Sequence, residues 1–283
     1  MEIPAMFDLT DKVALVSGAS RGIGAATAQI LAEYGAHVIL TSRKAENLKE
    51  VEAVIIKSGN QASSMVCHNG DLVQIEALFQ NIQKTHGRLD ILVNNAATNP
   101  FYGSVLAADE QAWDKTLNVN LKGPFFMSQH AAKLMRENGG GSIVNVSSIN
   151  GRIPMHKQSI YSITKAGLIS MTQAFAKELG LENIRVNALL PGLTDTKFAS
   201  ALTQNEELMK NVLQQIPMGR IAQPSEMSGM MLFLVSDAAS YVTGSTLWGT
   251  NSTGRRQFPC EWNLHQPPTD PCPGRDQTGC SKS

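Results

Sequence analysis

The sequence contains little cysteine, and the cysteines it has form no recognisable metal or redox motif. Cys67 lies in the body of the chain, whereas Cys260, Cys272 and Cys280 lie near its end. No two of them are spaced as a C-x-x-C pair, and the only histidine near the last three is His265. We therefore predict no metal site, and we expect unpaired thiols in a reducing compartment.

An excess of charge of either sign is also absent. Lys plus Arg and Asp plus Glu both number 24, so the formal net charge is zero and gives no support for a nucleic-acid or anionic-membrane partner. No apolar run is long enough to span a bilayer, and residues 1–4 lack the basic and apolar regions of a signal peptide. The sequence therefore predicts a cytoplasmic protein without nucleic-acid or membrane partners.

What the sequence does contain is a regular alternation of short apolar runs with segments of helical spacing. Strands are predicted at 12–17, 36–41, 62–67, 89–93, 142–146, 184–189 and 243–247. Helices are predicted at 23–34, 46–57, 72–86, 109–137, 158–179 and 224–236. This alternation predicts an α/β fold with a doubly wound, Rossmann-type parallel sheet flanked by helices. We expect one domain over 7–247 and a disordered tail over 248–283, where prolines are frequent and periodicity is lost.

A glycine-rich loop, SGASRGIG at 17–24, joins the first predicted strand to the first helix. Glycines let the backbone approach a pyrophosphate closely, and the helix N-terminus offers free N–H donors. The strict G-x-G-x-x-G pattern is not met, because Thr27 stands at its third glycine. The position of the loop nevertheless favours a dinucleotide site over a tight turn without a ligand.

The residues after the second predicted strand indicate which dinucleotide is bound. NAD sites place an acidic residue about 20 positions after the glycine loop, to hold the ribose hydroxyls. Here the sequence reads Thr41-Ser42-Arg43-Lys44, without a carboxylate. Arg43, together with Arg21 of the glycine loop, is suited to the 2′-phosphate of NADP(H), although both could be solvated loop charges. We therefore predict NADP(H).

Tyr161 and Lys165 are spaced to lie on one face of a predicted helix, one turn apart. An ordinary tyrosine has a pKa near ~10, and a nearby ammonium is expected to lower it. Tyr161 could then exchange a proton with a carbonyl or an alcohol as a hydride is transferred. The same spacing also occurs by chance as an exposed helix pair, so the surrounding residues decide between the two interpretations.

Polar residues at the ends of other predicted strands support the catalytic interpretation, because ligands bind at the carboxyl ends of parallel strands. Ser148 follows the fifth strand and could hold the substrate oxygen beside Tyr161, whereas Ser147 is expected to cap a helix or turn. Segments 94–97 and 191–192 end two further strands and should face the same crevice.

Together these motifs resemble those of the short-chain dehydrogenases/reductases. The resemblance covers 7–247 and consists of SGASRGIG at 17–24, NNAA at 94–97, VNLKG at 119–123, VSS at 146–148, YSITK at 161–165 and PGLTDT at 191–196, in that order. Segments 67–68, 99–103 and 113–115 further resemble the branch of NADP-dependent carbonyl and retinal reductases called dehydrogenase/reductase member 4.

The resemblance implies a catalytic tetrad of Asn120, Ser148, Tyr161 and Lys165. In this tetrad Asn120 interrupts a helix and holds a water that links Lys165 to solvent. It implies a wall of Asn94 and Ala96 beside the cofactor, and contacts from Thr194 and Thr196 to the nicotinamide amide and the diphosphate. His68 could stack on the adenine or cap a strand. The complete set of predicted cofactor residues is Gly18, Ser20, Arg21, Gly22, Ile23, Gly24, Ser42, Arg43, His68, Asn69, Asn94, Ala96, Tyr161, Lys165, Pro191, Gly192, Thr194 and Thr196.

The C-terminal part departs from the family. Members usually continue the last strand into Val-Asp-Gly-Gly, whereas here residues 248–251 read WGTN, which suggests a change of reading frame or read-through after Leu247. Because the last strand helps to build the family's tetramer, the resemblance implies a homotetramer.

The predicted activity is NADP(H)-dependent hydride transfer to or from a ketone, aldehyde, α-dicarbonyl or secondary alcohol. An apolar lid is expected over 197–218. Two alternatives stay open: a 3-oxoacyl-thioester reductase acting on acyl carrier protein, which shares the tetrad, and a non-catalytic NADP-binding scaffold.

Overall fold

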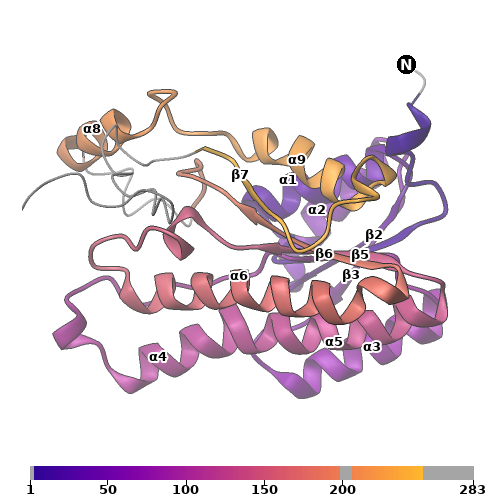
Figure 1. The fold of residues 1–283 in the computed structure, drawn as a ribbon. Helices are drawn as coiled ribbons and strands as arrows, with labels where there is room; N and C mark the ends of the chain where they lie inside the picture. The colour runs from indigo at the N-terminus through magenta and orange to yellow at the C-terminus, as the bar shows by residue number, and fades with distance from the viewer. Residues whose placement is uncertain (1–2, 198–205, 251–283) are drawn as a thin grey trace, which may run out of the picture.

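Seven strands form a single parallel sheet in the computed structural model, which describes residues 3–197 and 206–250 (Figure 1). The strands lie in the order β3-β2-β1-β4-β5-β6-β7. They are β1 (Val13–Ser17), β2 (His37–Ser42), β3 (Ala62–Val66), β4 (Ile91–Asn94), β5 (Gly141–Val146), β6 (Ile184–Leu190) and β7 (Thr246–Trp248). The order reverses between β1 and β4, and this reversal opens a crevice at the carboxyl ends of the strands.

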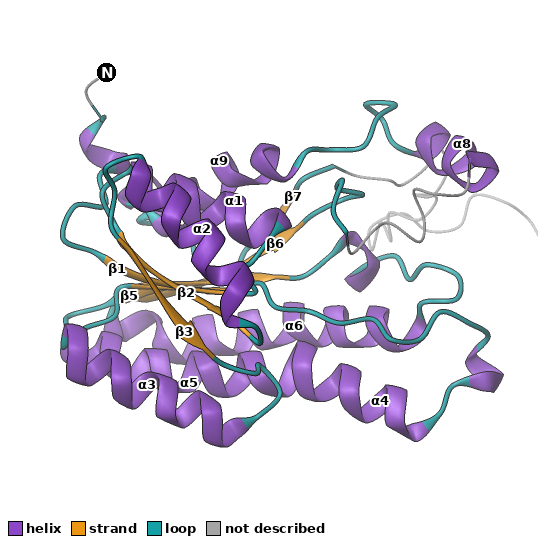
Figure 2. Cartoon of the chain, turned by 180° about the vertical axis from the view of Figure 1, so that it is seen from behind, coloured by secondary structure: helices purple, strands orange, loops and turns teal. Residues whose placement is uncertain are grey.

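Helices cover both faces of the sheet (Figures 1 and 2). On one face lie α1 (Gly22–Glu33), α2 (Ala45–Lys57) and α9 (Ser228–Val235). On the other face lie α3 (Leu72–His86), α4 (Glu110–Leu117), α5 (Gly123–Glu137) and α6 (Ser159–Leu179). A further helix, α8 (Glu206–Gln215), lies beyond the edge at which the strands end. This arrangement confirms the predicted doubly wound α/β fold.

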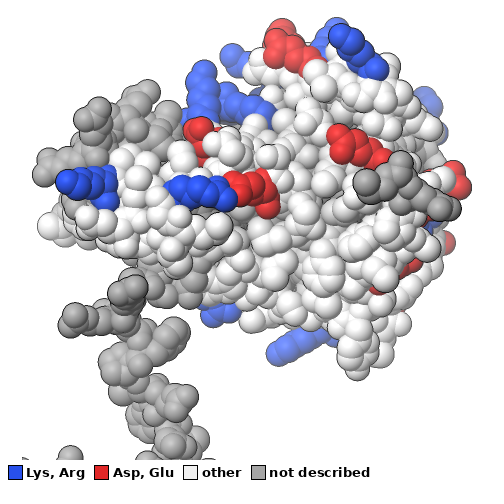
Figure 3. Space-filling model, turned by 90° about the horizontal axis from the view of Figure 1, so that it is seen from above, with Lys and Arg blue, Asp and Glu red and all other residues white. Residues whose placement is uncertain are grey.

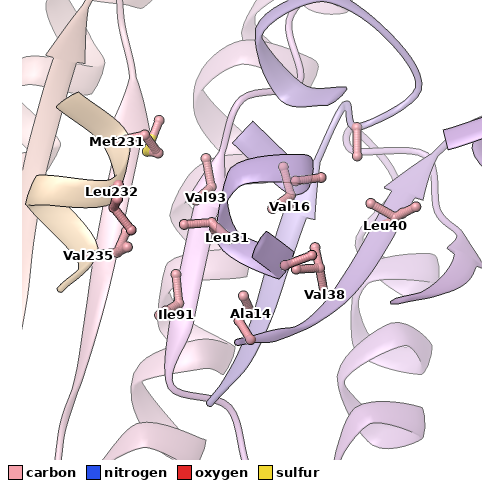
Figure 4. Packing of buried hydrophobic residues seen from close by; sticks show 14 of the residues in the cluster. Ala14, Val16, Leu31, Val38, Leu40, Ile91, Val93, Met231, Leu232 and Val235 are labelled. Atoms are coloured by element: carbon pink, nitrogen blue, oxygen red, sulfur yellow. The ribbon is translucent and has the colours of Figure 1, made fainter. Parts of the chain in front are cut away.

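The core consists of two apolar layers, one on each face of the sheet. In the first layer, Leu31 of α1 lies beside Val16, Val38 and Val93 of the central strands (Figure 4). The second layer packs the opposite side of the same strands, for example Leu15, against α3 and α5. Because both faces are covered, the central strands are buried throughout and read as continuous apolar runs.

Most predicted element boundaries agree with the structure within two residues, and three elements differ more. The helix predicted over 109–137 is two helices, α4 and α5, joined by a π-helical turn at Asn118–Lys122. The helix predicted over 224–236 begins with a 3-10 turn, Pro224–Met227, and becomes α-helical only at Ser228. The last strand begins three residues later than predicted, because Gly244 adopts a positive φ of 71° and ends a turn there.

The surface of the helical layer formed by α1, α2 and α9 carries charges of both signs. Uncharged residues occupy most of the face in Figure 3, and the basic and acidic side chains are scattered over it. Neither sign dominates this face, so it presents no continuous field to a charged ligand. Within 3–197 and 206–250, no helix has the length and hydropathy needed to cross a membrane.

Part of the predicted lid lies outside the described residues, including Phe198 and Leu202. The same holds for the tail from 251 onward, with its three cysteines. Among the described residues, α8 supplies a helix within the predicted lid segment.

Candidate active site

The loop between β1 and α1 has no room for side chains at two of its glycines. Gly18 has a φ of 66°, and a Cβ placed on it would lie 2.8 Å from the Cα of Ala96. A Cβ placed on Gly24 would lie 2.3 Å from the carbonyl oxygen of Gly18. The loop therefore turns tightly into α1, whose first N–H groups have no partners within the helix. Such a tight turn at a helix N-terminus suits the diphosphate of a dinucleotide.

Two residues that the sequence analysis did not assign hold this loop in place. The Ser17 hydroxyl accepts hydrogen bonds from the backbone N–H groups of Asn95 and Ala96, at 3.0 and 3.1 Å. The Asn95 amide donates to the carbonyl oxygens of Ser17 and Gly18, at 3.0 and 3.2 Å. The strand β4 is thereby tied to the glycine loop of β1. The NNAA motif indicated that an asparagine acts at this point, and the structure shows that Asn95 rather than Asn94 contacts the glycine loop.

Asn94, predicted on the cofactor wall, has a buried side chain that is hydrogen-bonded within the protein, so its contact with the cofactor stays a prediction. The Asn94 amide donates to the Ser128 hydroxyl and to the Asn145 carbonyl oxygen, both at 2.9 Å. Asn145 in turn donates to Thr172 of α6 at 2.9 Å. Asn94 therefore joins the sheet to α5 and, through Asn145, to α6. Ala96, in contrast, lies directly beside Gly18.

The segment after β6 extends over the start of α1. A methyl carbon of Thr196 lies 3.1 Å from the position that a Cβ on Gly22 would take. Thr194 is buried, donates to the carbonyl oxygen of Gly192 at 3.1 Å and forms a parallel bridge with Ala222. This placement brings Thr196 to the glycine loop, while the contacts of Thr194 and Thr196 with the cofactor stay a prediction.

Arg21 and Arg43 lie at the carboxyl ends of neighbouring strands. Arg21 begins α1 after β1, and Arg43 directly follows β2, which pairs with β1. Both are exposed, and the ion pairs between described residues include neither of them. Ser42, half-buried at the end of β2, donates to the carbonyl oxygen of Lys44 at 3.3 Å. Both guanidinium groups are thus accessible to an anion.

His68 and Asn69, predicted beside the adenine, both take part in local hydrogen bonds. The His68 ring accepts from the backbone N–H of Gly70 at 3.1 Å, and the Asn69 amide donates to the carbonyl oxygen of Val119 at 2.9 Å. The side-chain oxygen of Gln74 accepts from the backbone N–H of His68, and its amide donates to the side chain of Asp71, the N-cap residue of α3. His68 thus has a structural role in its loop. Its contact with the adenine stays a prediction.

Tyr161 and Lys165 lie one turn apart on α6 and are both buried. The Lys165 ammonium lies 5.5 Å from the centroid of the Tyr161 ring and donates to the carbonyl oxygen of Val146 at 2.8 Å. Tyr161 and Ser148 share a side-chain hydrogen bond. Three of the four predicted catalytic residues therefore form one cluster at the carboxyl end of β5.

The expected effect of Lys165 on the pKa of Tyr161 is not observed. Burial raises the pKa of the Tyr161 phenol to about 12, and the hydrogen bond with Ser148 offsets only part of this rise. Burial lowers the pKa of Lys165 to about 7, so at neutral pH the lysine carries only part of a positive charge. Desolvation therefore outweighs attraction between the two groups. At neutral pH Tyr161 holds its proton.

The turn cap expected of Ser147 is made by Ser148, which also contacts Tyr161 as predicted. Ser148, not Ser147, caps the 3-10 turn Ile149–Gly151, and its hydroxyl accepts from the N–H of Asn150 at 3.2 Å. Ser147 donates to the carbonyl oxygen of Lys165 at 2.7 Å and so ties β5 to α6. Ser148 combines the turn cap with the contact to Tyr161, because its hydroxyl can take part in more than one hydrogen bond.

Asn120 lies in the π-helical turn, where the sequence predicted that it interrupts a helix. Its side-chain oxygen accepts from the N–H of Thr98, and its amide donates to the carbonyl oxygen of Thr98, both at 2.8 Å. The same amide lies 3.2 Å from the hydroxyl of Thr164, the residue before Lys165. The side chain thus joins the loop after β4 to α6. A π-turn leaves backbone groups free of regular helical bonding, which suits the predicted water site.

Comparison with known proteins places this arrangement in a family. A family model described as enoyl-(acyl carrier protein) reductase matches residues 18–249. Dehydrogenase/reductase SDR family member 4 of Homo sapiens is 41% identical over 239 residues, which cover 84% of this chain and 86% of that protein. The chain belongs to the short-chain dehydrogenase/reductase family. The resemblance inferred from the motifs is thereby confirmed.

Solved structures show the same fold. A protein of Sinorhizobium meliloti described as a short-chain alcohol dehydrogenase has a TM-score of 0.83 and 38% identity, covering 86% of this chain and 96% of its own. A gluconate 5-dehydrogenase of Burkholderia cenocepacia, in complex with NADP and tartrate, has a TM-score of 0.83 and 29% identity, covering 86% and 95%. As a short-chain dehydrogenase/reductase, this chain is an oxidoreductase of a family that binds nicotinamide cofactors.

A separate cavity of about 200 Å³ lies at the amino-terminal ends of the strands, at the edge of the sheet opposite Tyr161. Both arginines that line it already have partners. Arg88 pairs with Asp90, and Arg185 donates to the carbonyl oxygens of Leu234 and Ser236. This cavity is therefore a poor candidate for a substrate site, and the chemistry is to be sought beside Tyr161.

Proposed function

We propose that this protein reduces ketones or aldehydes with NADPH, and that Tyr161 gives a proton to the carbonyl oxygen as hydride reaches the carbonyl carbon. The supporting observation is the buried Tyr161 phenol, which is hydrogen-bonded to Ser148 and lies one helical turn from the Lys165 ammonium. Burial raises the pKa of the phenol, so at neutral pH Tyr161 holds the proton that the reduction requires. The product is the corresponding alcohol, and the nicotinamide, when bound, supplies the hydride with its electron pair.

Each of the other tetrad residues has a role in this proposal. Ser148 donates a hydrogen bond to the substrate oxygen and orients it toward Tyr161. Lys165, with a pKa near 7, changes its protonation readily at neutral pH and can pass a proton toward Tyr161. Asn120 holds the loop after β4 against α6 through Thr98, and the backbone of its π-turn binds the water that we propose connects Lys165 with solvent.

For the cofactor, the geometry favours NADP(H) over NAD(H). The tight glycine loop at the start of α1 suits a diphosphate, and Arg21 and Arg43 are exposed beside the strand end that lacks a carboxylate. A planar guanidinium group forms paired hydrogen bonds with phosphate oxygens. The related gluconate 5-dehydrogenase was solved with NADP. We propose contacts from the glycine loop, both arginines, Ala96, Thr194 and Thr196, and from Lys165 to the nicotinamide ribose.

The division into a catalytic domain over 7–247 and a separate tail is likewise a proposal, as is the homotetramer. In the structure Trp248 still belongs to β7, so the catalytic unit includes at least this residue. The cytoplasmic location stays a prediction of the sequence.

The proposed activity is tested by following NADPH oxidation with a panel of aliphatic and aromatic ketones, aldehydes, α-dicarbonyls and one 3-oxoacyl thioester. Tyr161→Phe should lower kcat about 100- to 10,000-fold, the usual contribution of a general acid, whereas Tyr241→Phe, on a fully exposed side chain, should not. A Tyr161→Phe enzyme as fast as wild type would rule out the proposed acid. A preference for the thioester would favour the acyl reductase, and no turnover with any substrate would favour the scaffold.

The cofactor assignment is tested in the same assay. Arg43→Ala should lower kcat/KM for NADPH at least tenfold and leave that for NADH nearly unchanged, because only NADPH carries the 2′-phosphate. Lys57→Ala, which removes an exposed charge at the end of α2, serves as the control. Equal efficiencies of wild type with the two cofactors would contradict the assignment.

A further inference from the structure

One buried amide connects the loops that carry the proposed catalytic residues. Gln158 is only 5% exposed and directly precedes α6. Its carbonyl oxygen accepts from the side-chain amides of Asn150, at 3.2 Å, and Asn99, at 3.4 Å. Its own NH₂ group faces the sulfur of Met155 at 3.3 Å. Three separate segments, after β4, after β5 and before α6, therefore meet at this side chain.

Each partner of Gln158 lies next to a residue of the tetrad or its support. Asn150 is two residues after Ser148, and its N–H also donates to the Ser148 hydroxyl. Asn99 follows Thr98, which bonds Asn120 through both its N–H and its C=O. Gln158 is therefore linked to Ser148 through Asn150, and to Asn120 through Asn99 and its neighbour Thr98.

These contacts close a ring around the Tyr161 hydroxyl. The ring runs from Tyr161 to Ser148 through their hydrogen bond, from Ser148 to Asn150, and from Asn150 to Gln158. It returns to Tyr161 along the first turn of α6, since Gln158 is three residues before it. A closed ring fixes the separation of the two hydroxyls more firmly than the Tyr161–Ser148 bond alone, because a change in any one contact must be matched by the others.

The Gln158 side chain does not have the ordinary role of its position. It occupies the N-cap of α6, yet it makes no capping hydrogen bond to the helix. A residue serving only to begin the helix would favour Ser, Thr, Asp or Asn, whose side chains reach the first N–H groups. The buried amide is instead directed entirely at the neighbouring loops.

We propose that Gln158 is a positioning residue, which sets the distance between the Ser148 and Tyr161 hydroxyls for proton transfer to the substrate. The inference rests on the proposed function, because it assumes that these two hydroxyls act on the carbonyl oxygen. Loss of the carbonyl acceptor frees Asn150 and the turn behind Ser148. A misplacement of about 1 Å at a reacting group costs as much as ~100-fold in rate. The glycine loop is held by Ser17 and Asn95 and does not depend on this ring.

The experiment compares Gln158→Leu, which has similar size but no acceptor, with Gln158→Glu, which keeps an acceptor oxygen at the same reach. Gln158→Leu should lower kcat about 10- to 100-fold, with the NADPH Kd and the substrate KM each within threefold of wild type. Gln158→Glu should recover most of this loss. The matched control is Gln173→Leu, an exposed position on the same helix.

A double-mutant cycle with Asn150→Ala tests the shared contact. If both variants act through one hydrogen bond, the double variant should have nearly the kcat of Gln158→Leu alone. Independent, multiplying losses would overturn the positioning role, and so would a wild-type kcat in Gln158→Leu. If Gln158→Leu does not fold, the variants Asn150→Ala and Asn99→Ala test the proposal in its place. An unchanged kcat in both of them would overturn the positioning role of Gln158.

Tyr161→Phe is measured in the same series to separate the two proposals. An active Tyr161→Phe enzyme refutes the proposed function itself. An inactive Tyr161→Phe enzyme together with a fully active Gln158→Leu enzyme refutes only the positioning role.

Discussion

Replacing Lys165 by methionine should make the folded protein more stable at neutral pH while removing its activity. Lys165 is only 2% exposed, and burial is the cause that lowers its pKa from 10.5 to about 7. Methionine has a similar length and no charge to desolvate. The substitution therefore removes the cost of holding a partly charged ammonium in the interior, as well as the group that we propose relays a proton to Tyr161.

The magnitude follows from the pKa. At about 1.36 kcal/mol per pKa unit, a fall from 10.5 to about 7 corresponds to roughly 5 kcal/mol. The hydrogen bond from Lys165 to the Val146 carbonyl oxygen is also lost, and a buried group left without its partner costs about 1–3 kcal/mol. The Lys165→Met protein should therefore gain about 2–4 kcal/mol in free energy of unfolding at pH 7.

The gain should depend on pH in a defined direction. Between pH 7 and 10.5 the unfolded chain holds a proton on Lys165 that the folded protein has released. The wild-type stability contributed by this group therefore rises with pH across that window, and below pH 7 the cost is present in full. The variant lacks the group, so its advantage over wild type should shrink as the pH is raised.

Urea unfolding followed by circular dichroism at pH 7.0 and pH 9.5 measures both effects. Lys177→Met, which replaces an exposed lysine on the same helix, provides the control and should show no comparable gain. The reasoning is refuted if Lys165→Met is less stable than wild type at pH 7, or if its gain is the same at both pH values.

Two further predictions concern the glycine loop and a histidine pair. Gly24→Ala should weaken NADPH binding at least tenfold in a fluorescence titration, because the new methyl would lie 2.3 Å from a backbone oxygen, whereas Gly180→Ala, with no atom within 4 Å, should bind normally. Burial and the charge of His37 lower the pKa of His86 in the folded protein. As the pH falls below the usual histidine pKa, the unfolded chain therefore binds a proton at His86 before the folded protein does. The free energy of unfolding declines over this pH range as a result. His86→Gln should reduce the loss of Tm between pH 7.5 and 5.5, and an unchanged loss would count against this explanation.

The fold could be predicted from the sequence because its signals are local and repeated. Each buried strand is a short apolar run, and each helix between two strands shows helical spacing, so the alternation identifies a parallel doubly wound sheet. The π-helical turn could not be placed by periodicity. It adds one residue per turn without changing composition, and only the family resemblance pointed to Asn120 as the position of the break.

The site was predicted less completely than the fold. Tyr161, Lys165 and Ser148 come together as expected. The prediction left out Asn95, which holds the glycine loop, whereas the side chain of Asn94 bonds Ser128 and Asn145 on the face covered by α5 and α6. A strand buried on both faces has no polar–apolar alternation to show which face a residue occupies, so the sequence could not separate Asn94 from Asn95. Gln158 carried no signal, since its role depends on two loops remote from it in sequence.

The π-helical turn between α4 and α5 has a consequence for how this gene can vary. The turn contains one residue more than an α-helical turn would, and Asn120 lies inside it, between the partners Thr98 and Thr164. Deleting a single residue here would yield a more regular helix, yet it would rotate everything on one side of the deletion by about 100° relative to the other. A more regular helix would thus separate Asn120 from Thr98 or Thr164, so we expect the deletion to remove activity even where it does not lower the stability of the helix.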